Sequence, residues 1–122
     1  MRLHHVSIPA PSDRIGEGRA FYGDLLGLPE LAQPATLEAG SVIWFQAGDG
    51  ELHLFKEDAG TDVPTGRHYC FAVENVDEVR SRLEEAGVET EDTTPIHNRP
   101  RFFCQDPFGN RLEFTELRGP YQ

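Results

Sequence analysis

The chain has 122 residues, a length that suits one domain with a sizeable core. Its formal net charge of −10 argues against a nucleic-acid partner and against anionic membrane surfaces, because both call for a basic face. No apolar run approaches the ~20 residues that cross a bilayer, and no signal-peptide pattern opens the chain, so we expect a cytoplasmic protein. Cys70 and Cys104 are expected to be free thiols, and no Cys-x-x-Cys motif is present.

The first half of the sequence predicts a strand, a helix and then further strands. Residues 2–8 alternate in polarity and are followed by prolines, which predicts a strand and then a loop. Ser12 or Asp13 is the expected cap of a helix that ends at Leu26, and its well-formed part is expected to begin near Glu17, because Gly16 and Gly18 weaken its start. Apolar-rich runs at 41–47 and 51–56 flank Gly48-Asp49-Gly50, which predicts a hairpin. A short third element is expected near residues 29–33.

The second half predicts the same order of elements after a linker. The linker is placed at about residues 57–66, where charges, glycine and proline concentrate. Asn75 followed by Glu78 is a plausible capping pair for a helix that ends at Gly87. The strands of this half are predicted at residues 67–73, near 88–93, at 101–105 and at 111–116, the last two flanking a turn at 106–110.

These two halves repeat each other and carry similar side chains at equivalent points. His5 and His68 lie near the first strand of each half, 63 residues apart. His53 and Glu113 lie in the last strand of each half, 60 residues apart. We therefore expect an α+β protein built from two tandem strand–helix–strand–strand–strand (βαβββ) modules.

Strand phase places the four repeat-related residues on one kind of face. Side chains alternate across a sheet, so the leucines of residues 51–56 face the helix and His53 faces away from it. The same argument turns Glu113 away from the helix of the second half. A sheet curved around that face would form a cup lined by His5, His53, His68 and Glu113.

Three imidazoles and a carboxylate on one concave surface favour a divalent metal site. An unpaired carboxylate in a water-poor site is costly, and a cation removes that cost while accepting imidazole nitrogens. Two histidines and a carboxylate are typical of non-haem iron, and manganese, zinc, nickel or cobalt also fit. His53 has an alternative role as a hydrogen bonder to substrate. The other polar or aromatic residues nearby are interpreted as surface or core residues: His4, His97, Glu51 and Trp44.

Several segments of the sequence resemble the vicinal oxygen chelate superfamily over nearly the whole chain. That superfamily includes glyoxalase I, extradiol dioxygenases, methylmalonyl-CoA epimerase, and the fosfomycin and bleomycin resistance proteins. The segments that carry the resemblance are LHHVSI at 3–8, AFYGDLLGL at 20–28, GRHYCF at 66–71 and DPFGNRLEF at 106–114.

The resemblance implies a single domain over residues 1–122, with one module over about 1–58 and a second over about 67–118. It implies paired βαβββ modules that form an incomplete barrel around a metal, and it assigns the ligand positions to His5, His53, His68 and Glu113. The expected metal is iron, manganese, zinc or nickel. A homodimer is expected by resemblance, and the modules pair either within one chain or between two chains.

The resemblance also implies chelation of a small substrate through two adjacent oxygens. Glu113 or His53 is expected to move a proton, and Arg101, Phe103 and Ser7 are expected to contact the substrate, Arg101 through an anionic group. Three functions remain open at this point: a metal-dependent lyase, isomerase or dioxygenase; a drug- or metabolite-binding protein of the bleomycin-resistance kind; and a metal-bearing domain that has lost catalysis.

Overall fold

The computed structural model describes residues 2–58 and 67–120, and these fall into two compact units, Met1–Thr61 and Asp62–Gln122. We call the described parts of these units the first module and the second module. Apart from residues 57 and 58, the predicted linker at 57–66 lies outside the described residues.

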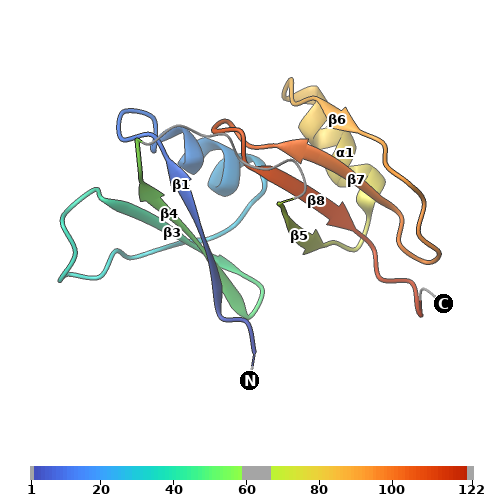
Figure 1. Cartoon of the computed structure of the whole chain (residues 1–122), viewed down its shortest axis with the longest axis horizontal. Helices are drawn as coiled ribbons and strands as arrows, with labels where there is room; N and C mark the ends of the chain where they lie inside the picture. Colours follow the sequence, from blue (N-terminus) through green and yellow to red (C-terminus); the bar gives the residue numbers. More distant parts are fainter. Residues whose placement is uncertain (1, 59–66, 121–122) are drawn as a thin grey trace. The chain divides into compact units, whose positions relative to one another are not determined.

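The first module is a four-stranded sheet with one helical segment (Figure 1). Its strands lie in the order β1-β4-β3-β2. Strand β1 pairs in parallel with β4, whereas β3 pairs antiparallel with both β4 and β2. The elements are β1 (His5–Ala10), η1 (Arg19–Leu25), β2 (Glu30–Leu31), β3 (Val42–Ala47) and β4 (Gly50–Lys56).

The second module repeats that arrangement in strand order and strand direction. Its order is β5-β8-β7-β6, with β5 parallel to β8 and the other neighbours antiparallel. The elements are β5 (Tyr69–Ala72), α1 (Val76–Glu85), β6 (Thr90–Glu91), β7 (Arg101–Gln105) and β8 (Arg111–Thr115). The predicted α+β class and the two βαβββ modules are therefore confirmed.

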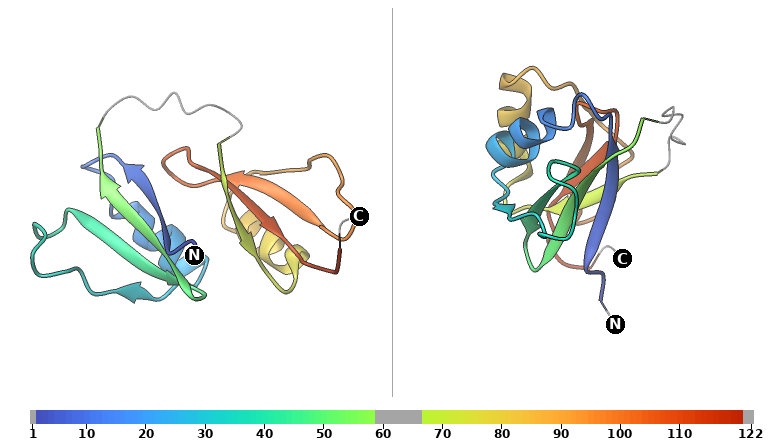
Figure 2. Two further views of the ribbon diagram at one scale, coloured as in Figure 1. Left: turned by 60° about the horizontal axis from the view of Figure 1, so that its bottom comes forward. Right: turned by 90° about the vertical axis from the view of Figure 1, so that its left-hand side faces the viewer.

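In each module the helical segment covers one face of the sheet (Figure 2). The apolar side chains of the strands are buried on this face, as the alternation in the sequence predicted. In the first module these include Ile8, Ile43, Phe45, Leu52 and Leu54, with Phe21 and Tyr22 from η1. In the second they include Phe102, Leu112 and Phe114, with Val76 and Leu83 from α1. The opposite face of each sheet is left for the polar residues.

Two elements of the first module differ from the sequence-based expectation. Strand β1 starts at His5 and continues through Pro9 to Ala10, beyond the predicted end at residue 8. A proline is tolerated there because β1 is the edge strand of the described sheet. The helical segment is a π-helix, with Leu26 N–H donating to Phe21 O, five residues earlier.

The helix of the second module follows its predicted caps. The Asn75 side chain accepts a hydrogen bond from Glu78 N–H at 3.1 Å, and Gly87 adopts a φ of +87° just after the helix. The turn at 106–110 is also confirmed, with Asp106 Oδ1 accepting from the N–H groups of Phe108 and Asn110. Within residues 2–58 and 67–120, no helix has the length and apolar character needed to span a membrane.

Candidate metal centre

The second module brings two of the predicted metal ligands together. Glu113 lies in β8, and its neighbours across the sheet are Cys70 in β5 and Phe103 in β7. His68 directly precedes β5, and its Nε2 atom lies 3.1 Å from Glu113 Oε1. Both side chains belong to the sheet face that α1 does not cover. The two side chains therefore lie on the same face of the sheet, as the alternation along the strands predicted.

Arg101 holds the other oxygen of the Glu113 carboxylate. Its Nη1 atom lies 3.0 Å from Glu113 Oε2, and its Nη2 atom donates to Thr94 O at 2.8 Å. The two side chains are only 14% and 12% exposed, so their charges are largely removed from water. The carboxylate is therefore fixed between an imidazole and a guanidinium. Pairing of Arg101 with an acidic neighbour was the alternative to its expected contact with substrate, and the sequence did not identify Glu113 as that neighbour.

Phe103 forms the apolar support of this cluster. Its ring is 6% exposed and meets the His68 ring edge-on, with the centroids 5.2 Å apart. The guanidinium of Arg111 lies 4.1 Å from the Phe103 centroid and that of Arg101 lies 5.6 Å away. The Phe103 ring thus contacts an imidazole and two guanidinium groups, and its assignment to substrate contact stays a prediction.

The two cysteines are not poised as thiolate ligands. Burial, together with the negative charge of Glu113, raises the pKa of Cys70 to about 11. Burial also raises the pKa of Cys104 to about 12. Both are free cysteines, as predicted, and both stay protonated at neutral pH.

In the first module, His5 and His53 lie together as members of an aromatic stack. The ring of His53 is stacked on the indole of Trp44, with centroids 3.8 Å apart and planes 5° from parallel. On its other side lies the ring of His5, at 4.1 Å and 17°. The strand register places Trp44 directly beside His53 in β3. His5 lies diagonally in β1, two residues before Ser7, which is the direct neighbour of His53 in that strand. The assignment of Trp44 to the core was wrong, since it shares the polar face with His53.

Glu51 is the main residue of this site that the sequence interpretation missed. Its Oε1 atom lies 2.8 Å from His53 Nε2, and its Oε2 atom lies 3.7 Å from His4 Nε2. The hydrogen bond to His53, followed by the charges of His4, His53 and His5, lowers the pKa of Glu51 below its usual value. Glu51 was interpreted as solvated and His4 as an ordinary histidine. The i, i+2 spacing that places Glu51 and His53 on one strand face was the signal available to predict the contact.

His4 and Ser7 complete the exposed edge of the first module. His4 Nδ1 lies 2.9 Å from His5 Nδ1, so a single proton between the two nitrogens links the neighbouring rings. Ser7 is exposed on β1, next to His53 in the register, and is accessible to a ligand.

Each module thus provides two of the four predicted ligands. Among the described residues, no group of three or more histidine, cysteine, aspartate or glutamate side chains is arranged to hold a metal ion. A four-ligand site therefore needs the pair of one module together with the pair of another. The ligand set as a whole stays a prediction.

The family follows from comparison with known proteins. Residues 2–114 match the family model of the Glyoxalase/Bleomycin resistance protein/Dioxygenase superfamily. The chain belongs to this superfamily. The resemblance inferred from the sequence motifs is therefore confirmed, and the superfamily includes both lyases and dioxygenases.

Solved structures of this superfamily cover almost the whole chain. A glyoxalase family protein from Bacillus anthracis is 34% identical, with a TM-score of 0.87, and the match covers 96% of this chain and 95% of that one. Lactoylglutathione lyase from Agrobacterium tumefaciens is 26% identical, with a TM-score of 0.72 and coverage of 94% and 92%. A glyoxalase/dioxygenase from Nostoc punctiforme, 24% identical with a TM-score of 0.76 and coverage of 97% and 92%, is similar in fold. A search of curated proteins found no match.

Proposed function

We propose that this chain is a metal-dependent enzyme that chelates a small substrate through two adjacent oxygens. His5, His53, His68 and Glu113 are the proposed ligands of one divalent cation. The observation that carries the proposal is the 3.1 Å approach of His68 Nε2 to Glu113 Oε1 on the sheet face that α1 does not cover. A nitrogen and an anionic oxygen at this separation are close enough to contact one cation together.

The donor set suits a divalent transition metal. Three imidazoles and one carboxylate match iron, manganese, zinc or nickel, and a six-coordinate ion keeps positions for substrate oxygens. One local rearrangement is required in the first module. Imidazole lone pairs lie in the ring plane, so two nearly parallel rings cannot both direct a nitrogen at one ion. The exposed His5 ring, which is not held in the core, is the one expected to turn.

His53 and Glu113 have different chemical capacities at this site. His53 Nε2 is engaged by Glu51, which fixes the ring and leaves Nδ1 as the nitrogen for a metal or a substrate. Glu113 has one oxygen held by Arg101, so Oε1 is the atom that can bind a cation or accept a proton. A divalent cation bound here would act as a Lewis acid and stabilise negative charge that develops on a chelated oxygen. Glu113 is the proposed proton carrier for that step.

The reaction class proposed is lyase, isomerase or dioxygenase, on a small substrate that carries an anionic group. The likeness to lactoylglutathione lyase from Agrobacterium tumefaciens supports lyase chemistry, and the family model supports the wider range. A homodimer is part of the proposal. The pairs from the two modules then meet either within one chain or between two copies of it.

The experiment is element analysis of protein purified without chelator, followed by turnover assays. The proposal expects one equivalent of a divalent metal per chain. Iron with catechol-dependent oxygen uptake would identify a dioxygenase, and anaerobic turnover with nickel, zinc or manganese would identify an isomerase or lyase. Protein that neither carries nor takes up stoichiometric metal would refute the proposal.

A second function is favoured by the stack of the first module. Trp44, His53 and His5 offer a layered aromatic surface of the kind on which planar ligands stack, and His53 is fixed there by Glu51. A sequestering protein of the bleomycin-resistance kind would use such a surface without metal. Saturable ligand binding that persists after exhaustive chelation, with no turnover of the ligand, would favour this second function.

A further inference from the structure

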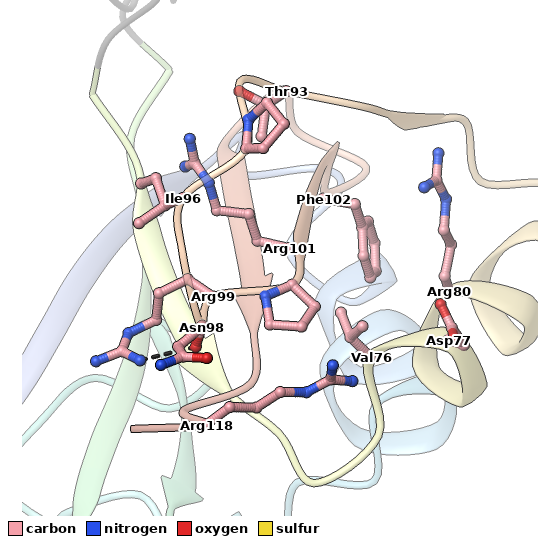
Figure 3. A pocket seen from close by; sticks show the side chains of 12 residues that line it. Val76, Asp77, Arg80, Thr93, Ile96, Asn98, Arg99, Arg101, Phe102 and Arg118 are labelled. Carbon is pink, nitrogen blue, oxygen red and sulfur yellow. Dashed lines mark hydrogen bonds between the residues drawn. The ribbon is translucent and has the colours of Figure 1, made fainter. Parts of the chain in front are cut away.

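We propose that the second module carries a separate site for a small organic carboxylate with an apolar body. The site is a pocket of about 410 Å³, which lies within the range of about 300–1,000 Å³ typical of ligand pockets. It is lined by the start of α1, by the segment 93–100, by the first residues of β7 and by Arg118 (Figure 3). All of the lining residues belong to the second module.

The charge of the lining is positive in a strongly acidic chain. Asp77 is the one acidic residue that lines the pocket, against four arginines: Arg80, Arg99, Arg101 and Arg118. The chain as a whole has a formal net charge of −10, so this concentration of guanidinium groups is local. Arginine is the side chain best suited to bind a carboxylate through two parallel hydrogen bonds, so this lining favours an anionic ligand.

Carboxylates outside the lining hold three of these arginines in place. The contacts are Arg80 Nη1 to Asp92 at 2.7 Å, Arg118 Nε to Glu116 at 2.9 Å and Arg101 Nη1 to Glu113 at 3.0 Å. None of the three acidic partners lines the pocket. The guanidinium groups are therefore oriented in advance, which lowers the entropy lost when they bind a ligand.

Arg118 keeps donor groups for a ligand. The side-chain contact of Arg118 is made through Nε, so its terminal nitrogens have no partner among the described residues. Figure 3 shows the Arg118 side chain extending towards Val76 at the start of α1. A carboxylate in the pocket would accept charge-assisted hydrogen bonds from these terminal nitrogens.

Apart from Thr93 and Asn98, the remaining lining residues are apolar, which argues for an organic anion over inorganic phosphate. Pro95, Ile96 and Pro100 contribute apolar surface from the loop, beside the buried side chains of Val76 and Phe102. Ile96 is 42% exposed, so its side chain is open to a ligand. A ligand with an apolar body covers this surface while its carboxylate meets the arginines.

This inference goes beyond the proposed function and does not require a metal. Arg101 is shared, because it lines the pocket and also holds Glu113. A carboxylate probe could itself bind a metal ion, so binding has to be measured on chelator-treated protein. With chelator-treated protein, the two proposals can fail independently. Absence of a metal site would not affect binding in the pocket, and absence of binding in the pocket would not affect the metal site.

The test is calorimetric titration of the chelator-treated full chain with 3-phenylpropionate, 3-phenylpropanamide and inorganic phosphate. Saturable binding of 3-phenylpropionate at one site is expected, with much weaker binding of the neutral amide and of phosphate. Arg118→Gln should raise the Kd at least tenfold, since it removes a charge-assisted contact. Arg82→Gln is the matched control, because Arg82 is an exposed α1 residue that does not line the pocket.

A second variant protects the test against a folding artefact. Ile96→Asp places a negative charge on the pocket wall and leaves Arg118 unchanged, and it should also weaken 3-phenylpropionate binding at least tenfold. Amide chemical shifts on titration should change in the segment 93–101 and at Arg118. The proposal is overturned by equal affinity in wild type and Arg118→Gln, by equal binding of acid and amide, by binding of phosphate alone, or by the absence of saturable binding.

Discussion

The two modules share strand order, strand direction and the position of one helical segment, yet their equivalent polar pairs are built differently. In the first module His5 and His53 are stacked rings, supported by Trp44 and fixed by Glu51. In the second, His68 and Glu113 form a polar contact that is supported by Arg101. Duplication of the backbone sets where the pair lies, and the neighbouring side chains decide what the pair can do.

The His68–Glu113 pair of the second module should be needed for metal binding. His68→Ala should lower metal affinity by about a hundredfold or more, since loss of outer-shell partners alone costs about 10–100-fold. The variant should stay folded, because the His68 side chain is 36% exposed. Element analysis of the purified protein checks this. His97→Ala is the control, and unchanged metal content in His68→Ala would remove His68 from the site.

Replacement of Arg101 should produce the largest loss of stability. Arg101→Met leaves the Glu113 carboxylate, which is 12% exposed, without its cationic partner, and we expect a loss of about 3 kcal/mol. Denaturant unfolding of the metal-free protein measures the loss. Adding Glu113→Gln should restore part of it, because the uncompensated charge is then gone. If the loss of stability in the double variant equals the sum of the losses in the two single variants, Arg101 does not act through Glu113.

The stacked ring of His53 should contribute more to folding stability than the side chain of His68. His53→Ala removes a ring that is 7% exposed from between two others, and we expect a loss of about 2 kcal/mol. This exceeds the loss expected for His68→Ala. Unfolding midpoints of the two variants, measured without metal, give the comparison directly. Equal losses would mean that the aromatic contacts of His53 add little.

The helical segments of the two modules also differ, since α1 has a side-chain cap and η1 has none. Asn75→Ala removes the hydrogen bond that Glu78 N–H donates, and it should cost about 1 kcal/mol. Chemical denaturation monitored by circular dichroism measures this. Ser81→Ala, at an exposed position within α1, is the control for helix propensity. An unchanged stability in Asn75→Ala would show that the cap is dispensable.

Low pH should destabilise the N-terminal end of α1. The hydrogen bond from Val76 N–H, and then that from Arg118, lower the pKa of Glu116 below its usual value of 4.5. Glu116 therefore stabilises the folded state above pH 4.5, and this contribution is lost as the pH falls through the lowered pKa. The stability difference between wild type and Glu116→Gln should shrink as the pH falls from about 6 to about 3. A difference independent of pH would contradict this assignment.

The sequence predicted the fold well because hydrophobic alternation, caps and turn residues act locally. The phase of β4 and β8 followed from Leu52, Leu54, Leu112 and Phe114, and the cap of α1 followed from Asn75. The extent of β1 was missed because the tolerance for Pro9 depends on an edge position in the sheet, which is a tertiary property.

The site was predicted only in part, for a similar reason. Phase placed His53 and Glu113 on the correct faces, but it did not identify their neighbours. Trp44 and Arg101 reach these residues from adjacent strands, so their contacts depend on register between strands distant in the sequence. The contact between Glu51 and His53 lies within one strand and was open to prediction from i, i+2 spacing.

The central claim is that one cation is held by the histidine pair of the first module together with the His68–Glu113 pair of the second. X-ray absorption at the cobalt edge of cobalt-loaded wild-type protein tests it most directly, because it counts the imidazoles around the ion. Our account predicts three imidazoles and one carboxylate around one cobalt per chain. A single imidazole with one carboxylate, the set that the second module offers alone, would contradict it.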